Sequence, residues 1–252
     1  MIEILKVLSC MPFLLYACYS DIKTRRVANE VWVVMFGVGY IFIMHDLLMF
    51  GLPYLIRNVL SFLFIFAFVY ILFQLGAFGG ADAKVLMVIS LIIPAYPLIT
   101  LGQNVLPISG VPPINIFAFS VFANSVLLTI VVPIGLFTYN LVTNPKASLK
   151  NPIYMFIGYI MPINELKKGH FRMMESYGRT KEGVNFKFTR SGTEITSNVI
   201  YELQSLYKNG KIEGGVWVTP GLPFMIPITA GFITAVVFGD LIFYLTMQFM
   251  ML

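Results

Sequence analysis

Long apolar runs, separated by short groups of charged and turn-forming residues, dominate the pattern along the chain. A bilayer core about 30 Å thick needs roughly 20 apolar residues of helix, and charged and turn residues mark the ends of such runs. On this basis the sequence predicts six spans, at about Ile4 to Ser20, Val31 to Phe50, Leu55 to Gly76, Val85 to Leu101, Ile114 to Val142, and Leu222 to the C-terminus. The expected fold is an α-helical membrane protein with about six transmembrane helices.

The pattern changes between the fifth and sixth expected spans, where polar residues return. Alternating apolar side chains predict a strand at Val184, Phe186 and Phe188. Apolar residues at helical spacing predict a helix that Thr193 could cap, with the face Ile195, Val199, Ile200, Leu203 and Leu206. Residues Lys211 to Thr219 fit a second extended piece, and Pro152 to Ile163 fit an interfacial segment. The insert is expected to be a small α/β subdomain.

This pattern predicts three parts. Residues 1–143 form a membrane domain with spans one to five, residues 144–217 a basic cytoplasmic subdomain, and residues 218–252 the sixth span that completes the membrane domain.

Composition excludes a soluble protein. Of 252 residues, 58% are hydrophobic and 12% charged, against roughly 45–50% and about 25% in ordinary soluble domains. The formal net charge of +5 is matched by the insert from Asn144 to Gly215 alone. No basic run interleaved with aromatic residues is present, so we expect no nucleic-acid partner. The cysteines Cys10 and Cys18 lack the spacing and companion ligands of a metal site, so no metal is expected.

Positive charge in the short loops predicts the orientation of the spans, because Lys and Arg are enriched on the cytoplasmic side. The first loop carries Lys23, Arg25 and Arg26, the second only Arg57, and the third Lys84, whereas the fourth has none and the fifth is the basic insert. Odd loops are therefore expected inside and both termini outside. Asp21 and Asp82, which flank the first and third loops, then face the same cytoplasmic boundary.

Acids at membrane depth are few and usually functional, and two of the four candidates are set aside. Asp46 lies beside His45 near the outer end of the second span, where a solvated interfacial pair is expected. Asp240 lies about 27 Å along a helix from Leu222, toward the outer side. Neither is expected to join a cytoplasmic site.

Asp21 and Asp82 remain, and each could also be an ordinary acid at a helix terminus. Three glycines precede Asp82, namely Gly76, Gly79 and Gly80, and they permit positive φ and close backbone approach. The carboxylate could thus be presented in a turn that a peptide can approach. If the two carboxylates meet, their like charge makes them share one proton, so that one acts as base and the other as acid on a water and a peptide bond.

The segment Gly79-Gly80-Ala81-Asp82 resembles the GxGD signature of intramembrane aspartic proteases. An aspartate that closes the first span, basic residues and Asn29 after it, and a second aspartate after a glycine-rich turn resemble the type IV prepilin peptidase family. Its archaeal branch, the preflagellin (prearchaellin) peptidases, is the most similar, because Ala81 is hydrophobic and a basic insert precedes Trp217-Val218-Thr219-Pro220 and the last span.

This resemblance implies an aspartic endopeptidase that removes a short positive leader from preflagellin or prepilin-like preproteins at the cytoplasmic boundary. It implies Asp21 and Asp82 as catalytic residues, a presenting loop of Gly76, Gly79, Gly80 and Ala81, and no cofactor. The cysteine-rich segment of bacterial members is missing, which implies proteolysis without methyl transfer. Lys23, Arg25, Arg26 and Lys84 are candidate contacts for substrate or membrane lipid.

Two other classes stay open on the sequence. A small proton-coupled transporter or ion pathway would also use intramembrane acids, although usually near the midplane and in paired repeats. A non-catalytic assembly protein would use the insert to bind a secretion partner.

Overall fold

The structure is a computed structural model that describes residues 1–143, 145, 152–166, 171–180, 183–210, 212 and 214–251. It contains two compact units. One joins Met1–Thr129 with Pro223–Leu252, and the other is Ile130–Leu222. The three-part division expected from the sequence has other limits than these two units and stays a prediction.

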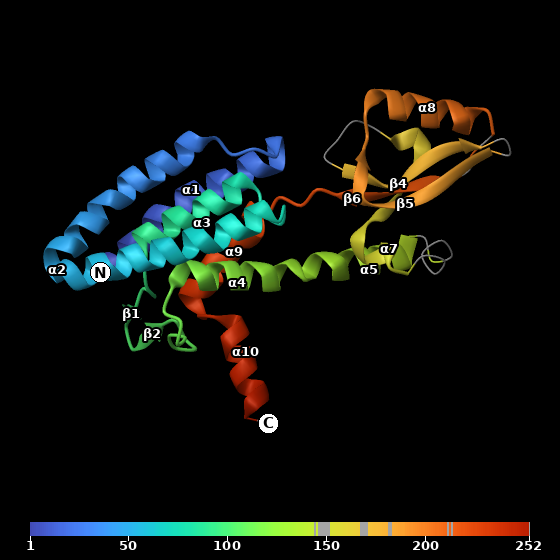
Figure 1. Cartoon of the computed structure of the whole chain (residues 1–252). Helices are drawn as coiled ribbons and strands as arrows, with labels where there is room; N and C mark the ends of the chain where they lie inside the picture. The colour runs from blue at the N-terminus through green and yellow to red at the C-terminus, as the bar shows by residue number, and fades with distance from the viewer. Residues whose placement is uncertain are drawn as a thin grey trace. The chain divides into compact units, whose positions relative to one another are not determined.

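The first unit begins with α1 (Ile2–Thr24) and α2 (Asn29–Gln74). The 46 residues of α2 are two helices joined at a break, because Gly51 has a non-helical backbone (φ 62°, ψ −144°) and Pro53 follows it. Figure 1 shows the chain turning back at this point. The two halves of α2 correspond to the second and third expected spans.

The next helix, α3 (Gly80–Ile92), is shorter than the fourth expected span of Val85 to Leu101. Pro94 and Pro97 lack the N–H that a longer helix would need, so the chain leaves the helix after Ile92. It continues into a hairpin of β1 (Ile99–Leu101) and β2 (Asn104–Leu106). Against α2, Gly39 lies so close to Ile92 that a Cβ there would meet its side chain at 2.3 Å.

The last helices of this unit are α4 (Phe117–Thr129), α9 (Met225–Val237) and α10 (Leu241–Met250). Gly231 lets α9 approach α4, since a Cβ there would lie 2.5 Å from the Val121 carbonyl oxygen. The sixth expected span is a bent pair, because α9 and α10 meet at 59°. The bend contains Gly239, whose φ of 95° suits glycine.

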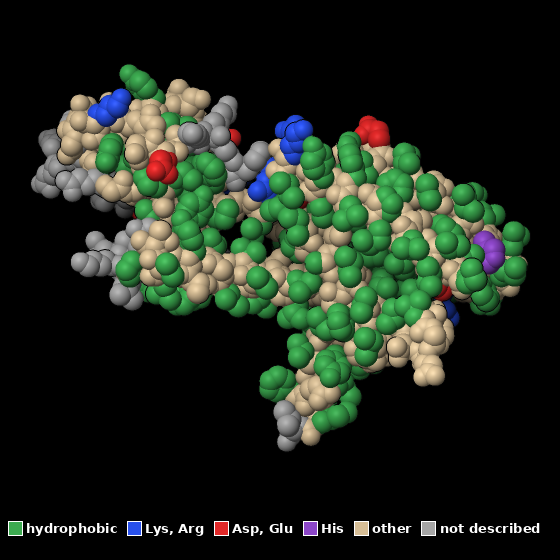
Figure 2. Space-filling model, turned by 180° about the vertical axis from the view of Figure 1, so that it is seen from behind, with side chains coloured by type: hydrophobic (Ala, Val, Ile, Leu, Met, Phe, Trp, Pro, Cys, Tyr) green, Lys and Arg blue, Asp and Glu red, His purple; other side chains and the backbone are tan. Residues whose placement is uncertain are grey.

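Helix length and apolarity identify three candidate membrane spans among the described residues, Ile2–Thr24, Asn29–Gln74 and Phe117–Thr143, and a fourth if the pair α9–α10 counts as one. The number six stays a prediction. Large apolar side chains face outward along α1 and α2, including Leu8, Leu15, Val33, Ile41 and Leu48, and Figure 2 shows such side chains over much of the visible helical surface. Soluble proteins rarely expose so much contiguous apolar surface to water, so this is a membrane protein.

The core of this unit lies where α1, α2, α3, α4 and α9 meet. Its fully buried side chains include Leu14, Ile65, Leu86, Ile89, Phe117 and Phe232. Phe117 packs edge-on against Phe232 with ring centroids 5.4 Å apart. One apolar cluster thus joins α1, which contains Asp21, α3, which contains Asp82, and α9.

The second unit contains α5 (Val131–Thr143), α7 (Tyr154–Ile157), η1 (Ile163–Glu165) and α8 (Ser197–Lys208) around a sheet. Its strands are β3 (Tyr159–Pro162), β4 (Phe171–Thr180), β5 (Gly183–Glu194) and β6 (Gly215–Pro220), in the antiparallel order β3-β6-β4-β5. Met173 and Val218 share a buried cluster with Leu203 of α8, and Met174 and Trp217 share one with Met155 of α7.

The expectations for the insert need two corrections. Thr196 rather than Thr193 caps the helix, because Thr196 Oγ1 accepts the N–H of Val199 at 3.4 Å while Thr193 pairs with Met173 in the sheet. Part of the expected interfacial segment, Tyr159–Pro162, is strand β3, which pairs with β6. The strand expected at residues 184–188 lies in β5. Several basic residues of the expected insert lie outside the described residues, among them Lys146, Lys150, Lys167, Lys168, Lys181 and Lys211.

Candidate active site

Asp21 lies in the last turn of α1, which continues to Thr24, beyond its expected end near Ser20. Its Oδ2 accepts the backbone N–H of Met225 at 3.2 Å. Met225 is the first residue of α9, whose initial N–H groups have no partner within the helix. This contact joins the end of the first helix to the beginning of α9 across more than two hundred residues of sequence, and it fixes the orientation of the Asp21 carboxylate.

The chain leaves α1 through a tight turn at Arg25. Arg25 has φ 56° and ψ 26°, the left-handed region, and its N–H donates to the carbonyl oxygen of Asp21 at 3.0 Å. The hydroxyls of Ser20 and Thr24 donate to the carbonyl oxygen of Arg26 at 2.7 and 3.0 Å. In the described part of the chain, Arg25 Nε and Nη1 are buried without a hydrogen-bond partner. The turn therefore holds the guanidinium group of Arg25, which follows Asp21 closely in the sequence.

Asp82 is the third residue of α3, and its Oδ2 accepts the N–H of Gly79, the residue before the helix, at 3.1 Å. One oxygen of Asp82 thus acts as an ordinary helix cap. The second oxygen of each carboxylate, Asp21 Oδ1 and Asp82 Oδ1, forms no hydrogen bond with any residue that the structure describes. Each acid therefore keeps one oxygen that can reach a water or a substrate.

The glycines before Asp82 have different structural roles. Gly76 has φ 68°, a conformation that favours glycine. A Cβ on Gly79 would lie 2.8 Å from Asp82 Oδ2, so a side chain at this position would displace the Asp82 carboxylate. Gly80 has ordinary φ, and the nearest atom to its Cβ would be Phe73 Cε2 at 4.0 Å. Ala81 is half-buried against the helical core. The presenting loop thus needs glycine at positions 76 and 79 but not at 80.

Asp21 and the loop before Asp82 both contact the start of α9. The Phe78 ring, just before the glycine pair, packs against Phe224 with centroids 5.2 Å apart, and the next residue, Met225, donates to Asp21. Asp82 precedes Val85, where the fourth span is expected to begin. Burial raises the pKa of Asp82 to about 6; the Gly79 N–H acts in the opposite direction, and the charge of Asp21 adds to the rise. The two carboxylates are therefore close enough to interact electrostatically.

The candidate contact residues occupy the same end of the helices. Lys84 Nζ donates to Asn29 Oδ1 at 2.6 Å, which links the beginnings of α3 and α2. Lys23 Nζ lies 5.6 Å from the centre of the Tyr19 ring and donates to its hydroxyl at 3.3 Å. Arg26 is exposed. Within the described residues, neither Lys84 nor Lys23 forms an ion pair with an aspartate.

Two structural supports of Asp21 were not found by sequence reasoning. One is the Met225 N–H, which any residue other than proline could supply, so no side-chain pattern identifies it. The other is Cys18, whose thiol donates to the Met225 carbonyl oxygen at 3.3 Å and lies 3.0 Å from Thr229 Oγ1. Cys18 lies one helical turn before Asp21, and this spacing is the only feature of the sequence that could have indicated its role near Asp21.

The acids set aside earlier lie elsewhere in the unit, and the expectation for Asp46 is wrong in part. Asp46 does contact His45, with 3.1 Å from Oδ1 to His45 Nδ1, but it is 2% exposed rather than solvated. Its Oδ2 pairs with Lys6 of α1, which also pairs with Glu3 at 2.6 Å. Asp240 caps α10 and accepts the Ser120 hydroxyl at 2.6 Å. No group of three or more His, Cys, Asp or Glu suited to a metal ion occurs among the described residues.

Regions similar to known proteins extend over nearly the whole chain. Residues 8–134 match the model of the type IV leader peptidase family, and residues 150–241 match the archaeal peptidase A24 C-terminus, type II. A preflagellin peptidase of Methanococcus voltae is 32% identical over 90% of this chain and 92% of its own length. Those of Methanocaldococcus jannaschii and Methanococcus maripaludis are 30% and 26% identical, over 90% of this chain and 91% and 92% of their own lengths.

The first match contains both Asp21 and Asp82, and the second contains most of the sheet unit and the start of α9. The chain is therefore a peptidase of the membrane and belongs to the type IV leader peptidase family.

Proposed function

We propose that this protein is a membrane-embedded aspartic endopeptidase that removes the short, positively charged leader of preflagellin or a prepilin-like preprotein. The proposal places cleavage at the cytoplasmic boundary of the membrane and assigns catalysis to Asp21 and Asp82. The preflagellin substrate comes from the names of the three relatives, and the cytoplasmic side comes from the Lys and Arg of the first and third loops.

The observation that carries the proposal is the approach of the two acids at the start of α9. Asp21 accepts the Met225 N–H, and the Phe78–Phe224 contact brings the loop of Asp82 to the same helix end. Neither acid has a lysine or arginine partner among the described residues. An acid without a cationic partner can exchange a proton with a reactant, because no fixed positive charge holds it ionised.

The proposed mechanism uses one proton shared by the pair. The raised pKa of Asp82 supports Asp82 as the partner that holds this proton before reaction. The ionised partner takes a proton from a water molecule, which attacks the scissile carbonyl carbon, and the protonated acid donates to the developing oxyanion. The tetrahedral intermediate then collapses, the C–N bond breaks, and the leaving amine receives a proton from the pair.

The position of the acids suits the proposed substrate. A preprotein whose apolar segment lies in the membrane and whose basic leader lies inside would place its scissile bond at the boundary where Asp21 and Asp82 are proposed to lie. Lys23, Arg25, Arg26 and Lys84 are proposed to contact lipid or substrate there. Among them, Arg25 Nε and Nη1, which are buried and have no hydrogen-bond partner among the described residues, are suited to peptide carbonyl oxygens. Methyl transfer to the new N-terminus is not part of the proposed activity.

The test is cleavage of a purified preflagellin by purified protein in detergent. Asp21→Asn and Asp82→Asn keep the size of each side chain but remove the acid, and each is expected to lower the rate at least about a thousandfold, which lies within the typical effect of one general acid or base. Asp240→Asn is the matched control, because Asp240 contacts Ser120 away from the pair, and it should cleave at nearly the normal rate. Full activity of either active-site variant would reject the mechanism.

A transporter would need membrane-embedded charges that can exchange protons along a path. The buried Asp46 is instead paired with Lys6, so no observation favours that function.

A further inference from the structure

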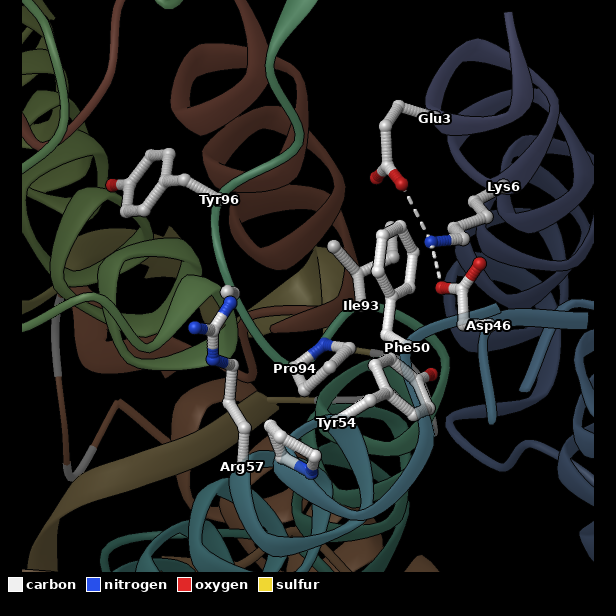
Figure 3. A pocket seen from close by; sticks show the side chains of 11 residues that line it. Glu3, Lys6, Asp46, Phe50, Tyr54, Arg57, Ile93, Pro94 and Tyr96 are labelled. Carbon is white, nitrogen blue, oxygen red and sulfur yellow. Dashed lines mark hydrogen bonds and ion pairs between the residues drawn. The ribbon is translucent and has the colours of Figure 1, made fainter. Parts of the chain in front are cut away.

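A second polar site lies in the helical unit, away from the aspartate pair. It is a cavity of about 360 Å³ whose wall includes Glu3, Lys6, Asp46, Tyr54 and Arg57. Figure 3 shows Glu3, Lys6 and Asp46 on one side and Arg57 on the other, with Ile93 and Pro94 between them. Glu3 lies in the first turn of α1 and Arg57 lies in α2 just after the break at Gly51, and both of these ends are expected on the outer side of the membrane. The cavity would then open at the leaflet opposite the proposed cleavage site.

The two sides of this cavity differ in charge. Lys6 is buried and contacts two carboxylates, those of Glu3 and Asp46, so this side carries one formal negative charge. Asp46 is nearly inaccessible at 3% side-chain exposure, whereas 31% of the Glu3 side chain is exposed. Arg57 is exposed and has neither an ion pair nor a hydrogen bond to any described residue. The cavity therefore offers an accessible carboxylate at one side and an unpaired guanidinium at the other.

An apolar groove continues from the Arg57 side of the cavity. It measures about 680 Å³ and shares Pro53, Arg57 and Pro94 with the polar cavity. Its remaining wall is mainly apolar, with Leu60, Leu63, Phe64 and Ile116. Leu60 and Leu63 lie on the outward surface of α2 and are more than half exposed. The guanidinium thus lies where a polar cavity meets an apolar groove, which is the boundary that a phospholipid phosphate occupies.

We propose that this double cavity binds one aminophospholipid, with its phosphate at Arg57, its ammonium at Glu3 and its apolar chains along the Leu60–Phe64 groove. Charge complementarity selects this occupant, because a guanidinium binds phosphate oxygens through paired hydrogen bonds and a carboxylate accepts hydrogen bonds from a primary ammonium. A quaternary ammonium has no N–H to donate, and an anionic headgroup without an amine leaves the Glu3 side unmatched. This site is independent of the proposed catalytic mechanism.

The test compares lipids on the delipidated full-length protein in detergent, by native mass spectrometry and thermal unfolding. Phosphatidylethanolamine should bind about tenfold more tightly than phosphatidylcholine or phosphatidylglycerol and raise the unfolding temperature most. Arg57→Gln should weaken phosphatidylethanolamine binding about tenfold, as expected for one lost charge-assisted contact, and Arg57→Lys should weaken it less. Glu3→Gln should remove the preference for phosphatidylethanolamine over phosphatidylcholine.

Two further variants distinguish binding of a lipid in the double cavity from nonspecific binding of lipid to the protein surface. Leu60→Trp, which fills the groove, should lower lipid binding while Arg57 is intact. Lys208→Gln removes one positive charge from α8 of the sheet unit and should change nothing. Equal binding of all three lipids, unchanged binding by Arg57→Gln, or binding of inorganic phosphate as tight as that of phosphatidylethanolamine would each overturn the proposal.

Discussion

An acid lies at each end of α1, Asp46 of α2 at its beginning and Asp21 at its last turn, and the two acids are in opposite electrostatic situations. Near its beginning, Lys6 contacts the carboxylate of Asp46, and both side chains are almost fully buried. At its last turn, about 22 Å along the helix, Asp21 is half-buried and receives one backbone N–H. Asp82, which lies near Asp21, likewise receives one backbone N–H and is half-buried.

The difference shows how the same residue type can serve structure or chemistry. A carboxylate with a buried lysine partner has a structural role, because either charge alone in an apolar environment would be costly. A carboxylate held by one N–H keeps an oxygen for other partners, and a second carboxylate close by makes proton sharing favourable. Burial alone would have pointed to Asp46, whereas the absence of a cationic partner in the described part of the chain points to Asp21 and Asp82.

The largest expected effect breaks the structural end. Lys6→Met leaves Asp46 buried without its main partner and should destabilise the protein by about 3–5 kcal/mol. Unfolding of the purified protein in mixed micelles measures this change. The double variant Lys6→Met with Asp46→Leu removes both charges and should regain most of the loss. A single variant as stable as the original protein would show that this pair is not important for folding.

The next effect concerns the loop that holds Asp82. Gly79→Ala places a methyl group 2.8 Å from Asp82 Oδ2, so the carboxylate must move, and a displacement of about 1 Å can lower catalysis about a hundredfold. Gly80→Ala meets nothing closer than 4.0 Å and should stay within about twofold of normal. Preprotein cleavage by the two purified variants tests this contrast, which is lost if both have the same activity.

The pH dependence should follow the proton on Asp82. A carboxyl group whose pKa is raised to about 6 keeps its proton below that pH and loses it above. Because the proposed mechanism needs one proton on the pair, kcat/KM should fall as pH rises through about 6, by about tenfold per unit. A series of cleavage rates from about pH 5 to about pH 8 measures this limb. Rates that increase throughout that range would contradict the assignment of the proton to Asp82.

A smaller effect is expected from the contact that joins the starts of α2 and α3. Lys84→Met removes the hydrogen bond to Asn29, which typically contributes about 1 kcal/mol, and should lower cleavage several-fold by loosening the position of Asp82. Asn29→Ala should have a similar effect, and the double variant should be no worse than either single variant. Lys23→Met, which removes a contact to Tyr19, is the control for loss of charge at the same end.

The smallest expected effect is that of a chelator, because carboxylates rather than a metal ion activate water in the proposed mechanism. Cleavage should continue at an unchanged rate in excess chelator. Activity that is lost on metal removal and regained on adding metal would show that the mechanism is wrong.

The amino-acid sequence by itself determined the membrane class, the approximate helical segments and the family resemblance. Runs of apolar residues determine these features because insertion into lipid depends on composition and length rather than on distant contacts. The sequence also predicted the strand at residues 184–188, since alternation with period two is a local signal. It failed at Thr193, because the choice of cap depends on where the preceding strand ends.

Only the tertiary structure decided which acids are paired and which are not. Asp46 is neutralised by a lysine forty residues away, and Asp21 receives its hydrogen bond from a backbone group on α9, which has no side-chain signature. The break at Gly51, the early end of α3 and the bend before α10 set where each polar group lies. Pairing and burial depend on contacts between distant segments, so they cannot be obtained from local patterns of residues.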